Sequence, residues 1–121
     1  SPADATTYYF GSVPVQAAST TADTQRLYVP KAGTFRTIRL FLNNSGTLGS
    51  NETSTISLRL NNTTDTAISA AVTNDAAATS FVNASLTIAV VAGDYFEFKW
   101  TTPTWATNPT NVRCTAIVYI D

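Results

Sequence analysis

The chain has 121 residues, one cysteine, no histidine and a formal net charge of −1, with 12% charged residues against roughly 25% in an ordinary domain. The low charge excludes a basic field for a nucleic-acid backbone, and the lack of histidine excludes Ser-His-Asp catalysis and imidazole metal ligands. A single cysteine excludes an internal disulfide. We expect one domain over residues 1–121, without cofactor or metal, and no segment that inserts into a membrane.

Apolar and polar residues alternate along most of the chain, which is the pattern of a strand with one face on a core. Ile56, Leu58 and Leu60, for example, alternate with Ser57 and Arg59. Turn residues separate the alternating segments. The predicted strands, in chain order, cover residues 7–16, 25–29, 34–43, 54–61, 66–73, 79–90, 95–101 and 111–120.

About eight short strands without a helix indicate an all-β sandwich or barrel, and we expect an antiparallel β-sandwich of the jelly-roll type. Pro30 lacks a backbone donor and Gly33 tolerates positive φ, so the chain is expected to turn sharply between them. The residues predicted to form the core are Ile56, Leu58, Leu60, Leu86, Ile88, Val90, Phe96, Phe98, Val118 and Ile120.

Some strands carry apolar residues on the face opposite the predicted core. Strands that are apolar on both faces are covered on both sides, either by a second protein surface or by edges and loops of the same chain. Low overall charge lowers the free-energy cost of association between copies of the chain, because few charged groups need to be desolvated. The residues we interpret as candidates for an interface with a second protein surface are Tyr8, Phe10, Phe41, Ile117 and Tyr119.

Two long polar loops are the candidates for ligand binding. Trp105 lies between two prolines, and an exposed tryptophan beside amides and hydroxyls suits stacking on a sugar ring. Alternatively, Trp105 folds back and closes one end of the sandwich, since large aromatic side chains are usually buried. The candidate ligand-binding residues are Trp105, Asn108, Asn44 and Asn51.

Nothing in the sequence points to catalysis. Most of the acids fall in predicted turns, where an aspartate caps its own backbone, and no spacing indicates a carboxylate pair of the glycosidase kind. Cys114 lies at an inward position of the last strand and lacks a histidine base, so we interpret it as a small buried apolar residue. The chain is therefore not expected to be an enzyme.

Three segments resemble the C1q/TNF-like jelly-roll family. Residues 31–35, Lys-Ala-Gly-Thr-Phe, followed by alternating Ile38, Leu40 and Leu42, are similar to the entry into a central strand of that family. Residues 91–98, Val-Ala-Gly-Asp-Tyr-Phe-Glu-Phe, resemble the turn before its penultimate strand, and the closing strand 114–120 ends in a similar way. The charge-poor surface, rich in Thr and Asn, is closer to phage and viral modules of this plan.

The resemblance implies a homotrimer around a threefold axis, with the five interface candidates named above between its subunits. The expected function is a trimeric fibre head of a virus or phage that recognises a host-surface glycan or protein, located on the virion. The alternatives are a trimeric capsid decoration protein and a carbohydrate-binding module of an enzyme. Because the chain begins at Ser1 without an initiator methionine, we interpret it as the C-terminal part of a longer chain.

Overall fold

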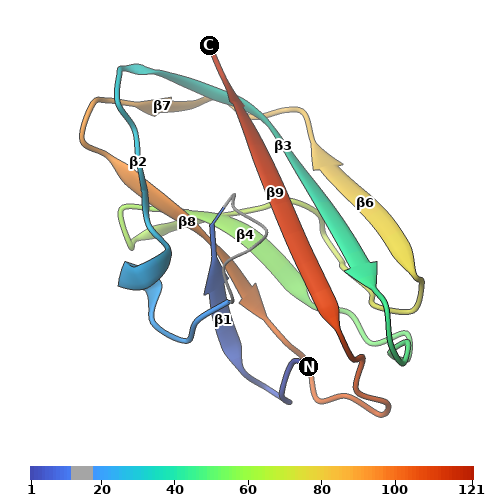
Figure 1. Ribbon diagram of the computed structural model, residues 1–121. Coiled ribbons are helices and arrows are strands. Elements are labelled where there is room, and N and C mark those ends of the chain that lie inside the picture. Colours follow the sequence, from blue (N-terminus) through green and yellow to red (C-terminus); the bar gives the residue numbers. More distant parts are fainter. Residues whose placement is uncertain (12–17) are drawn as a thin grey trace.

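The computed structural model describes residues 1–11 and 18–121. In this part of the chain, two antiparallel sheets pack face to face around a hydrophobic core (Figure 1). The helical structure among the described residues is a single 3-10 turn, η1 (Ala22–Gln25), so none of their helices is long enough to cross a membrane. The prediction of an all-β antiparallel sandwich is confirmed.

Sheet A is built around strand β8 (Tyr95–Thr101), which pairs along one side with β4 (Thr55–Leu60). On its other side, β8 pairs in succession with β2 (Leu27–Tyr28) and β1 (Thr7–Phe10). Strand β5 (Thr64–Ala67) pairs with β4 and completes the sheet. The aromatic side chains of β8 that point inward are therefore covered from both sides.

Sheet B is built around the long strand β3 (Gly33–Asn44). Strand β9 (Val112–Ile120) pairs with β3 on one side. Strands β6 (Ala78–Asn83) and β7 (Ile88–Val90) pair with β3 in succession on the other side. In Figure 1, β9, β3 and β6 lie side by side as one layer of the sandwich.

The predicted strand 79–90 is wrong as a single element, because the chain leaves the sheet between β6 and β7. Asn83 Oδ1 accepts a hydrogen bond from the Ser85 backbone N–H, which closes a local turn. Leu86 N–H then donates to Arg36 O, and the chain rejoins β3 further along. The apolar period of two runs on from Val82 to Leu86 in the sequence, so the pattern predicted one strand. In the structure, Phe81 packs against the core and Val82 is exposed, so the inward side changes from odd to even positions at this step.

Other strand boundaries shifted by a few residues. Asn61 and Asn62 both have positive φ, as in a tight hairpin turn, so β5 starts at Thr64 rather than at residue 66. It ends at Ala67, so most of the predicted strand 66–73 is wrong. Strand β2 is shorter than predicted. Strand β1 ends at Phe10, and the part of predicted strand 7–16 that falls on residues 12–16 lies outside the described residues.

The core lies between the two sheets and is rich in aromatic side chains. Phe98 is fully buried and contacts the rings of Phe10 (5.4 Å between centroids) and Phe96 (6.0 Å). Of the ten predicted core residues, Ile120 is wrong. It is 38% exposed, next to the end of the chain and beyond the bulge that shifts the register of β3 and β9. The other nine are buried or packed against the core.

Candidate binding face

The outer face of sheet B carries apolar side chains where a sandwich in water ordinarily carries polar ones. The strand register places its residues in rows across β6, β3 and β9. Four of them are large, apolar and exposed: Val82 (47%), Phe41 (44%), Ile117 (57%) and Tyr119 (60%). From one end of the sheet to the other, the rows are Ala78–Asn43–Arg113, Ser80–Phe41–Thr115 and Val82–Arg39–Ile117, followed by the pair Thr37–Tyr119.

The charge on this face is of one sign. Arg39 and Arg113 are exposed there, and none of the outward positions in these rows holds an acid. Neither arginine forms an ion pair with a described residue, whereas the arginines elsewhere in this part of the chain do. The outer face of sheet B is therefore partly apolar and carries a positive charge that no acidic side chain in these rows balances.

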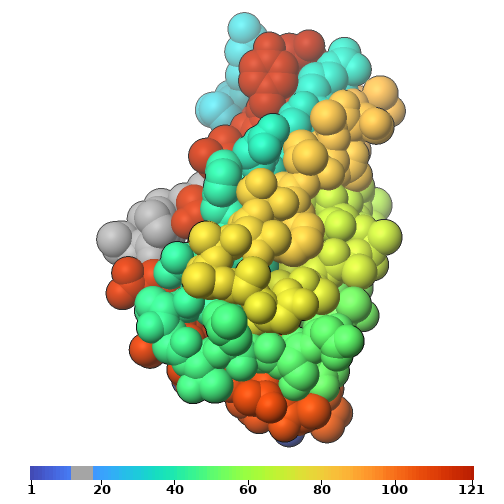
Figure 2. Space-filling view, turned by 90° about the vertical axis from the view of Figure 1, so that its right-hand side faces the viewer, coloured from blue at the N-terminus to red at the C-terminus, as the bar shows by residue number. Residues whose placement is uncertain are grey.

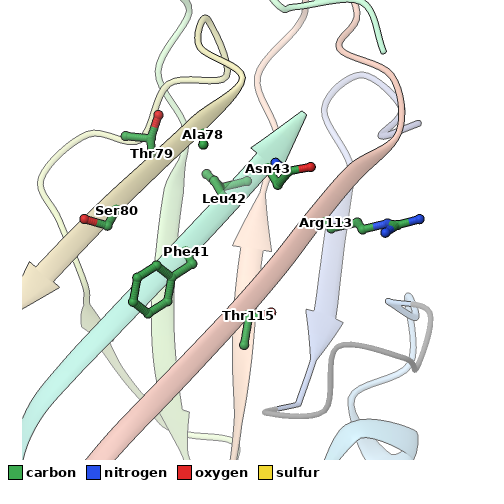
Figure 3. Close-up of a pocket in the computed structure, with 8 residues that line it drawn as sticks. All are labelled: Phe41, Leu42, Asn43, Ala78, Thr79, Ser80, Arg113 and Thr115. Carbon is green, nitrogen blue, oxygen red and sulfur yellow. The ribbon is translucent and has the colours of Figure 1, made fainter. Parts of the chain in front are cut away.

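A shallow hollow of about 590 Å³ lies in the first two rows of this face. We call it the Phe41 hollow, and Figure 3 shows the Phe41 ring with Ser80 on one neighbouring strand and Thr115 on the other. Small side chains on both sides of a large ring leave the space open. Its lining residues are Phe41, Leu42, Asn43, Ala78, Thr79, Ser80, Arg113 and Thr115.

The five residues predicted to form an interface do not share one surface. Phe10 is 4% exposed and stacks on Phe98, so placing it on an outer face was wrong. Tyr8 is half-buried and packs against the core. Both side chains lie on the inner side of sheet A, because β1 pairs them with the buried residues Trp100 and Phe98 of β8. Phe41, Ile117 and Tyr119 do lie together on the outer face of sheet B.

The loop residues predicted to bind a ligand separate into buried and exposed pairs. Trp105 is 5% exposed, so the interpretation that it folds back and closes the end of the sandwich is the correct one. Asn44 is also buried, and its amide donates to Asn74 O (3.2 Å) and Ala76 O (2.7 Å) as part of the fold. Asn51 and Asn108 are exposed.

Hydrogen bonds fix the loop that carries Trp105. The Trp105 N–H donates to Asp4 Oδ1 (3.2 Å), and the Ala106 N–H donates to Glu52 Oε1 (3.1 Å). Asn108 donates to the same Asp4 oxygen (3.0 Å). Figure 2 shows the loops 45–53 (green) and 102–110 (orange) gathered at the lower end of the molecule. These carboxylates therefore act as loop caps.

A charged cluster on the outer face of sheet A was not predicted. Arg59 is paired in register with both Asp65 and Glu97, and Lys99 Nζ lies 2.8 Å from Asp65 Oδ2. Alternation around Phe98 places Glu97 and Lys99 on the same outward side, which is the signal that could have revealed them. The strand pairing that adds Arg59 and Asp65 depends on topology and could not be predicted from spacing.

Glu97 is fully buried although it belongs to an outer face. The Asn62 amide, in the orientation that suits its neighbours, donates to Glu97 Oε1 (2.9 Å) and accepts from Arg26 (2.6 Å). Burial raises the pKa of Glu97 above its usual value, although Arg26 and Arg59 act in the opposite direction. The cluster closes over this carboxylate, so we interpret it as a structural network without access for a substrate.

Cys114 faces inward in β9, opposite Leu42. Burial raises the pKa of the Cys114 thiol to about 12, which leaves almost no thiolate at neutral pH. This environment agrees with the interpretation of Cys114 as a small apolar residue. Among the described residues, no group of three or more Cys, Asp or Glu side chains is arranged to hold a metal ion.

Comparison with known proteins adds no family to this description. No protein-family model matches the chain, and no curated protein matches it.

Proposed function

We propose that this protein is a non-enzymatic structural module that forms a homotrimer and recognises a host-surface receptor, as the head of a viral or phage fibre does. The observation that carries the proposal is the apolar outer face of sheet B, centred on Ile117 and Tyr119. Large apolar side chains that gather exposed on one face of a sheet mark protein interfaces more often than the rest of the surface does. A cyclic trimer buries such a patch in every subunit, and because the ring closes, no copy of the patch remains exposed.

The use of the acidic side chains supports a non-enzymatic role. Asp65 is paired with Lys99 and Arg59, Asp94 accepts hydrogen bonds from Val91 and Asn61, and Glu97 is buried. A general acid or base must reach the proton that it transfers. These side chains instead hold turns and strands together.

The alternative function as a capsid decoration protein uses the same trimer. Binding to whole host cells separates the two roles, because a fibre head binds the cell surface by itself and a decoration protein binds the capsid. The further alternative, a carbohydrate-binding module of an enzyme, would be a monomer with exposed coplanar aromatic residues on one sheet, so a monomeric mass in solution favours it. Trp105 is buried and is not one of these residues.

The interface proposal is tested by comparing two tyrosines with similar exposure. Tyr119 (60% exposed) lies on the proposed interface, and Tyr28 (64% exposed) lies on β2 of sheet A. We expect Tyr119→Asp to produce monomers in sedimentation velocity, because it places a charge in an apolar contact, and Tyr28→Asp to leave a trimer. Equal sedimentation of the two variants would contradict the proposal.

A further inference from the structure

We propose that the Phe41 hollow is a binding site for an anionic saccharide. The proposal names the receptor chemistry for the recognition role above and in that sense rests on it. The hollow is built from three strands of one chain, so it does not need a trimer to be complete. The proposed interface at Ile117 and Tyr119 lies in the following rows of the same face. The trimer contact is therefore assigned to that end of sheet B and leaves the hollow open, so that Phe41, first predicted as an interface residue, is assigned to the ligand.

An open aromatic ring forms the centre of the site. Phe41 is 44% exposed, and its partners across the sheet are the small residues Ser80 and Thr115. Neither neighbour is large enough to cover the ring, as Figure 3 shows. The C–H groups of a sugar pack against an aromatic face of this kind, because the face carries the negative end of the ring quadrupole.

Polar groups around the ring are available for a ligand. The side chains of Asn43, Ser80 and Arg113 make no hydrogen bond to another described residue, in contrast to the asparagines that cap loops elsewhere. An amide and a hydroxyl beside an open ring match the alternating hydroxyls and C–H groups of a pyranose. A purely apolar partner would leave these groups without hydrogen bonds, which is costly.

The charge of the face selects an anion. Arg113 borders the hollow, and Arg39 follows Phe41 two residues along β3, with no acid in these rows. Figure 3 shows the Arg113 side chain extended from β9 in the direction away from Phe41. Binding of an anion in the hollow therefore requires a change of the Arg113 rotamer that turns the guanidinium toward Thr115. There it can bind a carboxylate or phosphate through two parallel hydrogen bonds.

The test is a titration of the isotope-labelled protein followed by amide chemical shifts. The probes are N-acetylneuraminic acid and digalacturonic acid, which carry carboxylates, glucose 6-phosphate, which carries a phosphate, and galactose, which is neutral. We expect at least one anionic sugar to shift the amides of Phe41, Ser80 and Thr115 in a saturable way, and galactose to bind at least about tenfold more weakly. The anionic sugar that binds most tightly identifies whether the hollow prefers a carboxylate or a phosphate.

Three variants assign the binding to the hollow. Arg113→Ala and Phe41→Ala are each expected to weaken binding about tenfold or more, and both residues are exposed, so the fold is retained. Lys31→Ala removes the same charge at an exposed site outside the hollow and is expected to leave binding unchanged. Unperturbed spectra away from the hollow verify folding.

Three results would overturn the inference: no saturable shift with any anionic sugar, equal binding of galactose, or the same loss in Lys31→Ala as in Arg113→Ala. The outcome is separate from the trimer proposal. A trimer that binds none of these sugars contradicts the saccharide site alone, whereas a monomer that binds them through the hollow contradicts the trimer alone.

Discussion

At the scale of single residues, Phe98 at the centre of the core is the position where we expect substitution to reduce stability most. It is fully buried and contacts aromatic rings from two strands. We expect Phe98→Ala to lower the free energy of unfolding by about 3–5 kcal/mol, from lost transfer energy and the cavity that remains. Chemical denaturation measures the change. A cost under about 1 kcal/mol would mean that the side chain does not face the core.

Asp94 makes the stability depend on pH. Its carboxylate accepts hydrogen bonds from the Val91 N–H (2.9 Å) and from the Asn61 amide (3.0 Å), and these bonds lower the pKa of Asp94 below its ordinary value of 3.8. A lowered pKa means that folding favours the ionised form. The resulting stabilisation is therefore present above pH 3.8 and is lost as the pH falls through the lower pKa of the folded state.

We expect Asp94→Ala to melt at a lower temperature than the unmutated chain at pH 7. The difference should narrow as the pH falls below about 3.8, because the unmutated carboxylate then becomes protonated. Thermal melts by circular dichroism across this range measure it. A difference in melting temperature that stays constant with pH would show that ionised Asp94 adds nothing.

Individual residues also show where sequence reasoning reached its limit. The residue type favoured burial of Trp105 but did not exclude stacking on a sugar, because only the folded positions of Asp4 and Glu52 fix its loop. The burial of Glu97 was not predicted, since its neighbours Arg59 and Arg26 come from other parts of the chain. Contacts between distant segments decide such cases, and no local pattern reports them.

At the scale of elements, alternation predicted most strands well because the two sheets share one core. Strands β3, β4, β8 and β9 lie within one or two residues of their predicted bounds. The interruption between β6 and β7 was missed, since the apolar period continues through it. The same alternation predicted that Phe41, Ile117 and Tyr119 point outward. The Phe41 hollow depends on which residues of β6 and β9 lie beside Phe41, and this strand register could not be predicted from the alternation.

The turn between β7 and β8 offers a test at this scale. Gly93 has a φ of 94°, and a Cβ atom added there would meet nothing within 4 Å. Gly93→Ala therefore changes backbone strain without creating a clash. We expect it to lower the free energy of unfolding by about 1–2 kcal/mol in urea denaturation. A gain in stability, as for a glycine in an ordinary conformation, would contradict the turn geometry.

At the scale of the whole molecule, the two sheets differ in what they present to the outside. The outer face of sheet A is closed by ion pairs and by the buried Glu97. The outer face of sheet B is apolar and positively charged, without acids in its rows. This asymmetry favours sheet B as the side that meets other molecules, which is why we propose self-association at Ile117 and Tyr119 and ligand recognition at Phe41.

The molar mass of the unmutated chain in solution tests this arrangement most directly. An interface that holds a stable trimer should bury more than about 2,000 Å² per pair of subunits and persist at micromolar concentration. Size-exclusion chromatography with light scattering at that concentration should give three times the chain mass of 12.9 kDa. A mass near 12.9 kDa would contradict the trimer and, with it, the proposal of a fibre head.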